Sequence, residues 1–450
     1  MKSLEKMSLK EWLAHCEALH TQEIDLGLGR VQLVREALGV QFDCPVIVVA
    51  GTNGKGSTCA MLESIYQNAG YRTGVFTSPH LIHFEERCRI EQKVVDEGDL
   101  LPSFVAVEKA RYAAGQDNVP VSLSYFEFTT LVILHFMSGQ NLDVAVLEVG
   151  LGGRLDAVNI IDSDCAVITS IDVDHVDYLG PEREGIALEK AGIMRAGRPV
   201  VIGDPMPPAS MLDYAAELGA DMWQCGRDFR FEKVADADSD ALGWSWFGRS
   251  VVLENLPLPA LVGEHQLLNG AGVLAAVEAL KDKLPVSLEA ISKGLLKVAL
   301  AGRFQVVCTH PAVVLDVGHN PHAAKALRQN LRQMGEYGRT FAVFGAMRDK
   351  DIGAILTLLM PEIDGWFFTD LPLPRAIAAT ELEVLAKKVQ NVVNKPLKSK
   401  TYKKPFDALQ AAFKEAGEAD RIIVFGSFYA VGGILEDGLP VISPASHKLR

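Results

Sequence analysis

Short apolar runs that alternate with amphipathic stretches dominate this sequence. The runs of the first half are VIVVA (46–50), DVAVLEVG (143–150), CAVITSI (165–171) and PVVIGD (199–204). Strands that are apolar on both faces are buried on both faces, which is typical of a parallel sheet with helices on each side. The alternation begins again at AVVLDV (312–317) and continues to RIIVFGS (421–427). The sequence therefore predicts an α/β protein built from two modules.

The segment KVALAGRF (297–304) separates the two series of strands and helices. We expect a P-loop domain with a mainly parallel sheet at residues 1–298, a linker at residues 299–303, and a smaller Rossmann-like α/β domain at residues 304–450. Between residues 229 and 253, FRFEKV and WSWFGRSVVL alternate with period two around the polar ADADSDALG. This alternation indicates a small antiparallel hairpin.

Composition and charge exclude several classes of protein. The 450 residues include 44 Lys and Arg against 57 Asp and Glu, which gives a formal net charge of −13. A non-specific nucleic-acid binder needs a basic surface that displaces counterions, so we expect no nucleic-acid partner. The N-terminal residues predict an amphipathic helix rather than a signal peptide, and no uncharged apolar run reaches the roughly 18 residues that cross a bilayer. We therefore expect no membrane partner.

The seven cysteines are odd in number and scattered, and they include no C-x-x-C pair. A disulfide framework needs paired cysteines, and a cysteine zinc site needs closely spaced ones. The sequence predicts neither, and a reducing cytoplasm is the expected location.

The run VIVVA leads into a glycine-rich loop, GTNGKGS (51–57), and then into an expected helix that ends near Asn68. A strand, a glycine-rich turn and a helix N-terminus point several backbone N–H groups at one place, where the helix dipole favours an anion. Lys55 adds a positive charge for terminal phosphates. We favour a nucleotide site over a plain β–α turn with an exposed lysine.

This loop departs from the strict pattern G-x-x-x-x-G-K-[ST]. Val49 stands where that pattern has its first glycine, and Gly56 follows the lysine. Ser57 or Thr58 is expected either to cap the helix or to bind Mg²⁺.

A second glycine-rich element is LEVGLGGRLDAVN (147–159), in which Glu148 ends an apolar strand. The next strand leads to SIDVDHVDYLG, so Asp172, Asp174 and His175 are expected at the same carboxyl edge of the sheet. A carboxylate and an imidazole on adjacent strand ends suit a Mg²⁺ site beside a phosphate loop. The alternatives are a solvated rim glutamate and an ordinary loop histidine.

The second module contains LDVGHNPHAAKAL, in which Asp316 ends a strand and His319, Asn320 and Pro321 begin a helix. Polar groups at this edge suit a nucleotide base, a ribose or an acidic substrate. Asn-Pro is also an ordinary helix start, so the motif alone leaves both interpretations open.

Together these motifs resemble the folylpolyglutamate synthase family of ADP-forming ligases, which is related to the Mur peptide-adding enzymes. The resemblance covers nearly the whole chain and is strongest to the bifunctional bacterial branch. Its motifs are DLGLGRV (25–31), GTNGKGS, TSPHLIHFEER (77–87), SYFEFTTL (124–131), LEVGLGGRLDAVN, DHVDYLGPEREGIALEKAGI (174–193), GEHQLLNGAGV, GRF, LDVGHNPHA, FGAMRDKDI (344–352) and FGSFYAVG.

The resemblance implies roles for particular residues, and it implies that ATP binds across the domain boundary. The ATP-binding residues would be Thr52, Asn53, Gly54, Lys55, Gly56, Ser57, Asn269, Arg303, Asp316 and His319. The ligands of two Mg²⁺ ions would be Ser78, Glu148, His175 and Lys190 as a carbamate. The pterin-binding residues would be Asp25, Leu26, Gly27, Ser124, Tyr125, Phe126, Glu127, Leu155, Asp156 and Ala157. The catalytic residues would be Lys55, His175 and Lys190, the last two by holding metal.

The reaction that the resemblance implies is an ATP- and Mg²⁺-dependent ligation of L-glutamate. It would convert dihydropteroate to dihydrofolate and extend reduced folates to folylpolyglutamates, through an acyl phosphate, with release of ADP and phosphate. Alternatives are a monofunctional folylpolyglutamate synthase, a Mur-type enzyme acting on UDP-muramoyl substrates, and a P-loop kinase or NTPase. We disfavour the Mur-type enzyme because the phosphate loop starts at residue 51, where we expect no UDP-binding domain to precede it. We disfavour the kinase because it would leave the second module without a role. We expect a monomer.

Four positions depart from the pattern usual in this family. Val158 and Ala430 stand where threonine is usual, Gly318 stands where alanine is common, and Glu85 stands where asparagine is frequent. None of the four is a proposed ligand.

Overall fold

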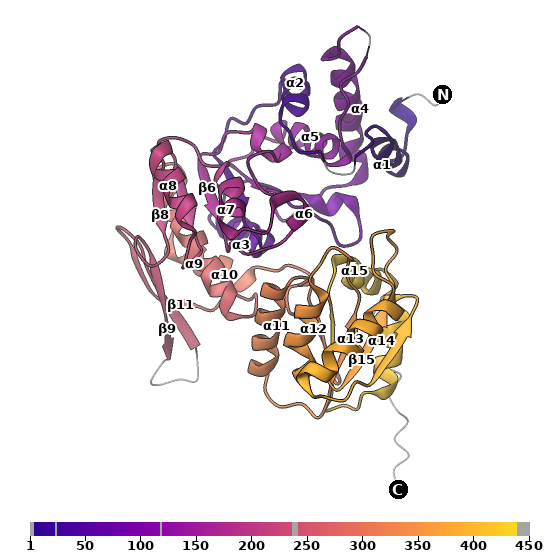
Figure 1. The fold of residues 1–450 in the computed structure, drawn as a ribbon. Helices are drawn as coiled ribbons and strands as arrows, with labels where there is room; N and C mark the ends of the chain where they lie inside the picture. The colour runs from indigo at the N-terminus through magenta and orange to yellow at the C-terminus, as the bar shows by residue number, and fades with distance from the viewer. Residues whose placement is uncertain (1–3, 23–24, 118, 236–241, 439–450) are drawn as a thin grey trace. The chain divides into compact units, whose positions relative to one another are not determined.

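The computed structural model describes residues 4–22, 25–117, 119–235 and 242–438. The chain forms two compact units, residues 1–300 and residues 301–450. Figure 1 draws the first unit in indigo to pink and the second in orange to yellow. Among the described helices, none combines the length and the apolar character that a membrane crossing requires.

The first unit is built on a mainly parallel sheet, for which the described residues give eight strands in the order β4-β3-β2-β5-β1-β6-β7-β8. The pairs from β2 to β8 are parallel, whereas β3 and β4 continue the sheet as antiparallel strands. The strands are β1 (Val46–Ala50), β2 (Thr73–Phe76), β3 (Cys88–Ile90), β4 (Lys93–Val94), β5 (Val144–Glu148), β6 (Cys165–Ile168), β7 (Pro199–Ile202) and β8 (Asp221–Gln224).

Helices cover both faces of this sheet, because its central strands are apolar on both sides. Successive residues of a strand point to opposite faces, and in β1 Val46 and Val48 enter one hydrophobic core while Ile47 and Val49 enter the other. One core is closed by α1 (Leu9–Ala18), α2 (Gly29–Leu38), α4 (Glu97–Ala113), α5 (Tyr125–Ser138), α7 (Arg183–Ala191) and α8 (Ala209–Leu218). The other is closed by α3 (Lys55–Asn68), α9 (Glu264–Ala279) and α10 (Leu288–Lys297). Short helical turns are η1 (Leu4–Lys6), η2 (Phe84–Arg87), η3 (Ala157–Ile160) and α6 (Val176–Leu179).

The predicted hairpin is confirmed and extended to a small antiparallel sheet with the order β11-β10-β9. Its strands are β9 (Arg230–Ala235), β10 (Leu242–Phe247) and β11 (Val252–Pro257). Trp244 and Trp246 pack into the second core of the first unit, which anchors the hairpin to α9. Residues 236–241, the centre of the predicted polar turn, lie outside the described residues.

The second unit is an α/β module whose described strands form a six-stranded sheet in the order β12-β13-β17-β14-β15-β16. All pairs are parallel except β12 with β13. The strands are β12 (Gln305–Thr309), β13 (Ala312–Leu315), β14 (Thr340–Phe344), β15 (Gly365–Thr369), β16 (Ser399–Tyr402) and β17 (Arg421–Phe425). The helices are α11 (Pro321–Gln333), α12 (Ile352–Leu359), α13 (Ala379–Val393), α14 (Pro405–Glu415) and α15 (Phe428–Asp437), with a 3₁₀ turn, η4 (Met360–Glu362).

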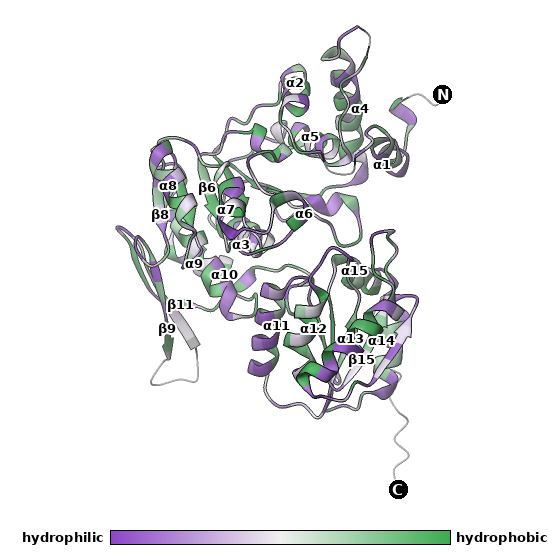
Figure 2. Cartoon of the chain, in the orientation of Figure 1, coloured by the Kyte–Doolittle hydropathy of each residue, from purple (hydrophilic) through white to green (hydrophobic). Residues whose placement is uncertain are grey.

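The predicted fold class, two α/β modules with a small antiparallel element, is confirmed. In Figure 2, helices α11 and α13 carry both hydrophilic and hydrophobic residues, as expected for helices that cover a sheet with one face. The apolar-run pattern did not single out β12 and β16, because edge strands expose polar side chains to solvent: β16 is SKTY, with exposed lysine and threonine.

Candidate active site

The glycine-rich loop leaves β1 at Gly51 and enters α3 at Lys55, as the sequence predicts. Hydrogen bonds fix it to the segment that follows β6. The backbone N–H of Thr52 donates to the carbonyl of Ser170 over 2.8 Å, and its hydroxyl donates to the carbonyl of Asp172 over 2.8 Å. The loop is therefore held between two strand ends, with its N–H groups at the N-terminus of α3.

At two positions of the loop, the backbone conformation and the close neighbours leave space only for glycine. Gly51 has φ 150°, and a Cβ there would lie 1.8 Å from the Thr169 hydroxyl oxygen. Gly54 has φ 87°, and a Cβ there would lie 2.5 Å from Oδ1 of Asn269. Any larger residue would displace the loop from α9 or from the strand end.

The expectation that Ser57 or Thr58 caps α3 is wrong. The helix begins at Lys55 with Gly54 as its N-cap, because the left-handed conformation of this glycine turns the chain directly into the helix. Ser57 and Thr58 lie in the first turn and are buried. The helix N-terminus is thus left without a side-chain cap and open to an anion.

The Lys55 ammonium lies over the loop, where Nζ donates to the carbonyls of Gly51 (3.0 Å) and Thr52 (3.3 Å). A flexible lysine stem can exchange these carbonyls for phosphate oxygens without moving the backbone.

A residue that the sequence interpretation missed supports the loop from α9. Gln266 is buried, its amide Nε2 donates to the hydroxyl of Ser57 over 3.2 Å, and its Oε1 accepts from Nδ2 of Asn269 over 3.0 Å. Its signal was its place in the GEHQLLNGAGV motif, one helical turn before Asn269. The structure thereby brings Asn269 to the phosphate loop.

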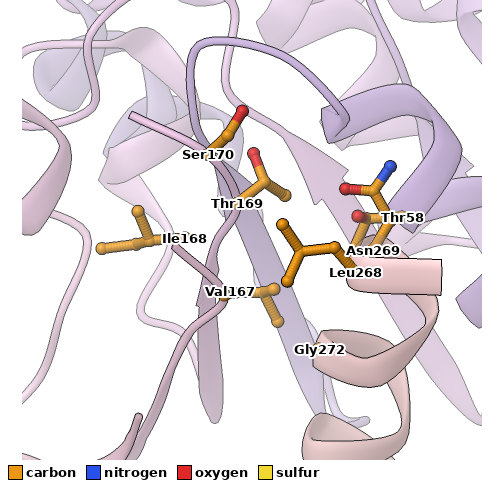
Figure 3. A pocket seen from close by; sticks show the side chains of 9 residues that line it. Thr58, Val167, Ile168, Thr169, Ser170, Leu268, Asn269 and Gly272 are labelled. Carbon is orange, nitrogen blue, oxygen red and sulfur yellow. The ribbon is translucent and has the colours of Figure 1, made fainter. Parts of the chain in front are cut away.

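A small pocket lies behind the loop, between the end of β6 and α9 (Figure 3). Its lining residues are Thr58, Val167, Ile168, Thr169, Ser170, Gly203, Leu268, Asn269 and Gly272. The Thr58 hydroxyl is buried and has no hydrogen-bond partner among the described residues. In Figure 3 the Thr58 and Asn269 side chains lie close together, so the pocket belongs to the same site.

Ser78 and Glu148 lie together next to this loop. The backbone N–H of Ser78 donates to Oε2 of Glu148 over 3.2 Å, and Glu148 pairs in register with Val49 of β1. A serine hydroxyl and a carboxylate are hard oxygen donors of the kind that Mg²⁺ and Mn²⁺ prefer. This pair therefore fits a divalent cation.

The expectation that the strands bearing Glu148 and His175 are adjacent is wrong. Glu148 ends β5 and His175 follows β6, and β1 lies between these strands. In a doubly wound sheet the order along the chain is not the order in space. The consequence is that the phosphate loop lies between the two segments.

His175 is the N-cap of α6 and has φ 52° and ψ 45°, a left-handed conformation that is uncommon for residues other than glycine. The Asp174 carboxylate accepts the backbone N–H of His175 over 2.8 Å and stabilises this turn. Residues held in such conformations cluster at functional sites. Among the described residues, no group of three or more His, Cys, Asp or Glu side chains forms a metal cluster; a metal here would need hydroxyl, lysine-derived or substrate oxygens as well.

Lys190 is buried in the last turn of α7, under the second glycine-rich loop. A Cβ on Gly153 would lie 3.1 Å from the Lys190 Cα, so this glycine permits close packing of the loop on α7. Burial, followed by the charge of Lys55, lowers the pKa of Lys190 to about 7. Asp174 and Asp156 oppose this shift. A large fraction of the amine is consequently neutral near pH 7.

Asp156 caps η3 in the same loop and is buried. Its oxygens accept the N–H groups of Leu151 and Val158, each over 2.9 Å. Burial raises the pKa of Asp156 to about 6, and these backbone hydrogen bonds oppose the shift. Leu155 and Ala157 flank it in the predicted pterin-binding segment.

The other predicted pterin segments lie nearby, because α2, α5 and η3 pack against one another. Ser124 is the N-cap of α5 and forms a capping box with Glu127. The Phe126 ring lies so close to Gly150 that a Cβ there would be 2.5 Å from it. Arg87 lies over the ring of Tyr125, 5.7 Å from its centroid. Asp25, Leu26 and Gly27 precede α2.

In the second unit, Arg303, Asp316 and His319 lie around the start of α11. Asp316 Oδ2 accepts the N–H of Phe304 over 3.0 Å, and its Oδ1 accepts that of Gly318 over 2.7 Å. The Arg303 guanidinium lies 5.1 Å from the ring centroid of Phe428, and the His319 ring lies 6.3 Å from it. Burial raises the pKa of Asp316, whereas these hydrogen bonds and Arg303 lower it.

Comparison with known proteins adds the following similarities. Residues 49–277 match the family described as Mur ligase middle domain, and residues 302–428 match Mur ligase, glutamate ligase domain. The chain is 42% identical over 429 residues to the dihydrofolate synthase/folylpolyglutamate synthase of Escherichia coli (strain K12), covering 95% of each chain. It is 41% identical to the protein of the same name from Haemophilus influenzae, covering 94% of this chain and 96% of that one.

Solved structures show the same similarity. One is E. coli FolC in complex with DHPP and ADP, with a TM-score of 0.87, 41% identity and coverage of 96% and 98% of the two chains. Another is a bifunctional folylpolyglutamate synthase/dihydrofolate synthase with Mn, AMPPNP and L-glutamate bound, with a TM-score of 0.86, 39% identity and coverage of 97% and 99%.

Proposed function

The chain belongs to the dihydrofolate synthase/folylpolyglutamate synthase family of ATP-dependent Mur ligases, and on this premise we propose that it joins L-glutamate to dihydropteroate and to reduced folates. The products are dihydrofolate and folylpolyglutamates, with ADP and phosphate. The observation that carries the proposal is the uncapped N-terminus of α3, with Lys55 over the loop and the Ser78–Glu148 pair beside it.

The chemistry requires an activated carboxylate, because the carboxylate anion repels a nucleophile and hydroxide is a poor leaving group. A carboxylate oxygen attacks the γ-phosphorus of ATP, and the bond to ADP breaks. The amine of glutamate then attacks the carbonyl carbon of the acyl phosphate, and phosphate leaves with the bonding electron pair. Both steps concentrate negative charge, so preorganised positive groups stabilise them.

We propose that the first unit supplies these groups. Thr52 to Ser57 form the phosphate site: the Thr52 N–H fixes the loop to Ser170, and the N–H groups at the start of α3 bind the phosphates. Lys55 neutralises the charge that develops on the transferred phosphoryl group. Gln266 and Asn269 hold the loop in this shape. In the second unit, Arg303, Asp316 and His319 are proposed to bind ATP as well.

Two Mg²⁺ sites are part of the proposal. Ser78 and Glu148 would hold one ion; His175 and Lys190, the latter as a carbamate, would hold the other. Bound Mg²⁺ neutralises phosphate charge and polarises the transferring phosphoryl group. A carbamate forms when a neutral amine nitrogen attacks CO₂ and releases a proton, and the lowered pKa of Lys190 favours that neutral amine.

For the pterin acceptor we propose Asp25 to Gly27, Ser124 to Glu127, and Leu155 to Ala157. The packing of α2, α5 and η3 supports a common pocket for these segments. We retain the domain bounds 1–298 and 304–450, a monomeric state and a cytoplasmic location as further proposals. All seven cysteines are described residues and are free thiols, which suits a reducing compartment.

The test is ADP release by the purified protein with ATP, Mg²⁺ and L-glutamate, with dihydropteroate or a reduced folate as acceptor. We expect turnover with both acceptors and a mass increase of one glutamyl unit for each cycle. Turnover with the folate alone would replace the proposal with a monofunctional folylpolyglutamate synthase. Equal ADP release without glutamate would indicate an NTPase.

A further inference from the structure

Arg30, the second residue of α2, contacts two of the segments proposed to bind the pterin. Its NH1 lies 2.8 Å from Oδ2 of Asp25, and its NH2 donates to Oε1 of Glu127 over 2.8 Å. The same NH2 reaches the backbone carbonyl of Asp25 at 3.2 Å. One guanidinium therefore connects the loop before α2 to the first turn of α5.

A histidine completes this network by contacting the same oxygen of Asp25. His20 Nε2 lies 3.0 Å from Oδ2 of Asp25, and its Nδ1 lies 2.7 Å from the hydroxyl of Ser122. Ser122 precedes the N-cap of α5 by two residues and also donates to the carbonyl of Leu19 over 3.2 Å. Both connections from Asp25 thus lead to the start of α5.

Burial makes the Arg30 connection to Glu127 the stronger of the two. The Glu127 side chain is 5% exposed, compared with 29% for Asp25. Its other oxygen accepts the N–H of Ser124 over 2.7 Å as part of the capping box. Removal of Arg30 would leave a buried carboxylate without its cation, which is costly and would disturb the cap.

Geometry also specifies arginine over lysine at this position. The two carboxylates are reached by different nitrogens of one planar group, and an ammonium on a flexible stem presents a single point charge instead. A lysine here would keep the charge and lose one of the two connections.

We propose that Arg30 is a positioning residue that sets the geometry of the pterin-acceptor pocket by holding Asp25 to Gly27 against Ser124 to Glu127. The inference rests on the proposed function, which assigns these two segments to the acceptor. Arg30 acts through Asp25 and Glu127, on the affinity for the acceptor rather than on phosphoryl transfer.

The test compares Arg30→Ala and Arg30→Lys with the wild-type enzyme. For Arg30→Ala we expect the KM for dihydropteroate to rise by at least about tenfold, since two charge-assisted hydrogen bonds are lost. The KM for ATP stays within about twofold, and Arg30→Lys gives an intermediate value. Amide hydrogen exchange of residues 25–28 should become faster in Arg30→Ala.

The control is Arg348→Ala, because Arg348 in the second unit also uses two guanidinium nitrogens, but binds both oxygens of a single surface carboxylate, Glu381. Its KM values should equal those of the wild type.

If Arg30→Ala lowers the melting temperature but leaves every KM unchanged, Arg30 is only structural and the inference is wrong. If Arg30→Ala does not fold, a KM for dihydropteroate in Arg30→Lys equal to that of the wild type refutes it. Inactivity of the wild type with every acceptor would instead refute the proposed function.

Discussion

The two units use the carboxyl edges of their parallel sheets differently. In the first unit this edge carries buried ionisable groups whose pKa values are displaced towards neutrality, Lys190 to about 7 and Asp156 to about 6. In the second unit the corresponding edge carries Asp316, bound by two backbone N–H groups, and a cation–aromatic contact between Arg303 and Phe428.

The buried charges of the second unit lie mostly at the other end of its sheet. Asp420 accepts from Arg339 over 2.7 Å, and Arg421 donates to the hydroxyl of Thr340 over 2.9 Å, all at the beginnings of strands. Burying charge is destabilising unless it is paired. The paired charges at the strand beginnings of the second unit stabilise its fold. The ionisable groups at the carboxyl edge of the first unit have shifted pKa values, which is typical of a functional site. We propose on this basis that the first unit carries both the phosphoryl transfer and the acceptor pocket, whereas the second unit contributes to ATP binding.

The largest effect is expected at the phosphate loop. Lys55→Ala should lower kcat by about a thousandfold, because it removes the cation that we propose faces the transferring phosphoryl group. Steady-state turnover measures this, with Lys404→Ala as the control for loss of an exposed lysine in the second unit. A decrease in kcat of less than tenfold would mean that Lys55 does not stabilise the transition state. The carboxyl edge of the first unit would then not be the place of phosphoryl transfer.

In the second unit, the next largest effect is expected from a side chain added where the backbone is closely packed. Gly426 follows β17 with φ 102°, and a Cβ there would lie 2.5 Å from the Phe344 ring and 2.7 Å from the Gly345 carbonyl oxygen. Gly426→Ala should reduce the free energy of unfolding by about 3 kcal/mol, measured by denaturant titration. Gly335→Ala is the matched control, since Gly335 has φ 95° and open space around it, and should cost only about 1 kcal/mol. If the two variants lost the same free energy of unfolding, the loss would come from the positive φ alone and not from the contacts of the added Cβ.

The pKa of Asp156 predicts a pH dependence of the stability of the first unit. Its folded pKa, about 6, lies above the usual 3.8. The stabilisation from the protonated carboxyl is therefore complete below about pH 4 and is lost as the pH rises through about 6. Relative to Asp156→Asn, the wild type should lose about 2 to 3 kcal/mol between pH 4 and pH 7. Parallel stability curves for the two proteins would contradict the raised pKa.

The smallest effect is expected for exposed ion pairs of the second unit. Arg348 and Glu381 form a forked pair whose side chains are 56% and 49% exposed. Arg348→Ala should change the free energy of unfolding by less than about 1 kcal/mol, because water and salt screen such pairs. Thermal unfolding at low and high salt would measure this. If the free energy of unfolding fell by several kcal/mol, the pair would be part of a larger charge network that stabilises this surface.

Apolar patterning was sufficient to predict the strands β1, β5, β6 and β7 of the first unit and β13 and β17 of the second, since both faces of those strands are buried. It did not predict β16, whose exposed lysine and threonine resemble a loop. Gln266 was also missed, because a buried glutamine within a helix has no local pattern; its role depends on Ser57, 209 residues away in sequence.

The sequence by itself determined the α/β class, the glycine-rich phosphate loop and the residue types available for each role, because these depend on local periodicity and on the chemistry of side chains. Only the tertiary structure decided which of these residues meet. It placed β1 between β5 and β6, buried Lys190 beneath Gly153, and joined Asp25 to Glu127 through Arg30. Strand order and burial arise from packing between segments distant in sequence, and burial in turn shifts the pKa values on which the chemistry depends.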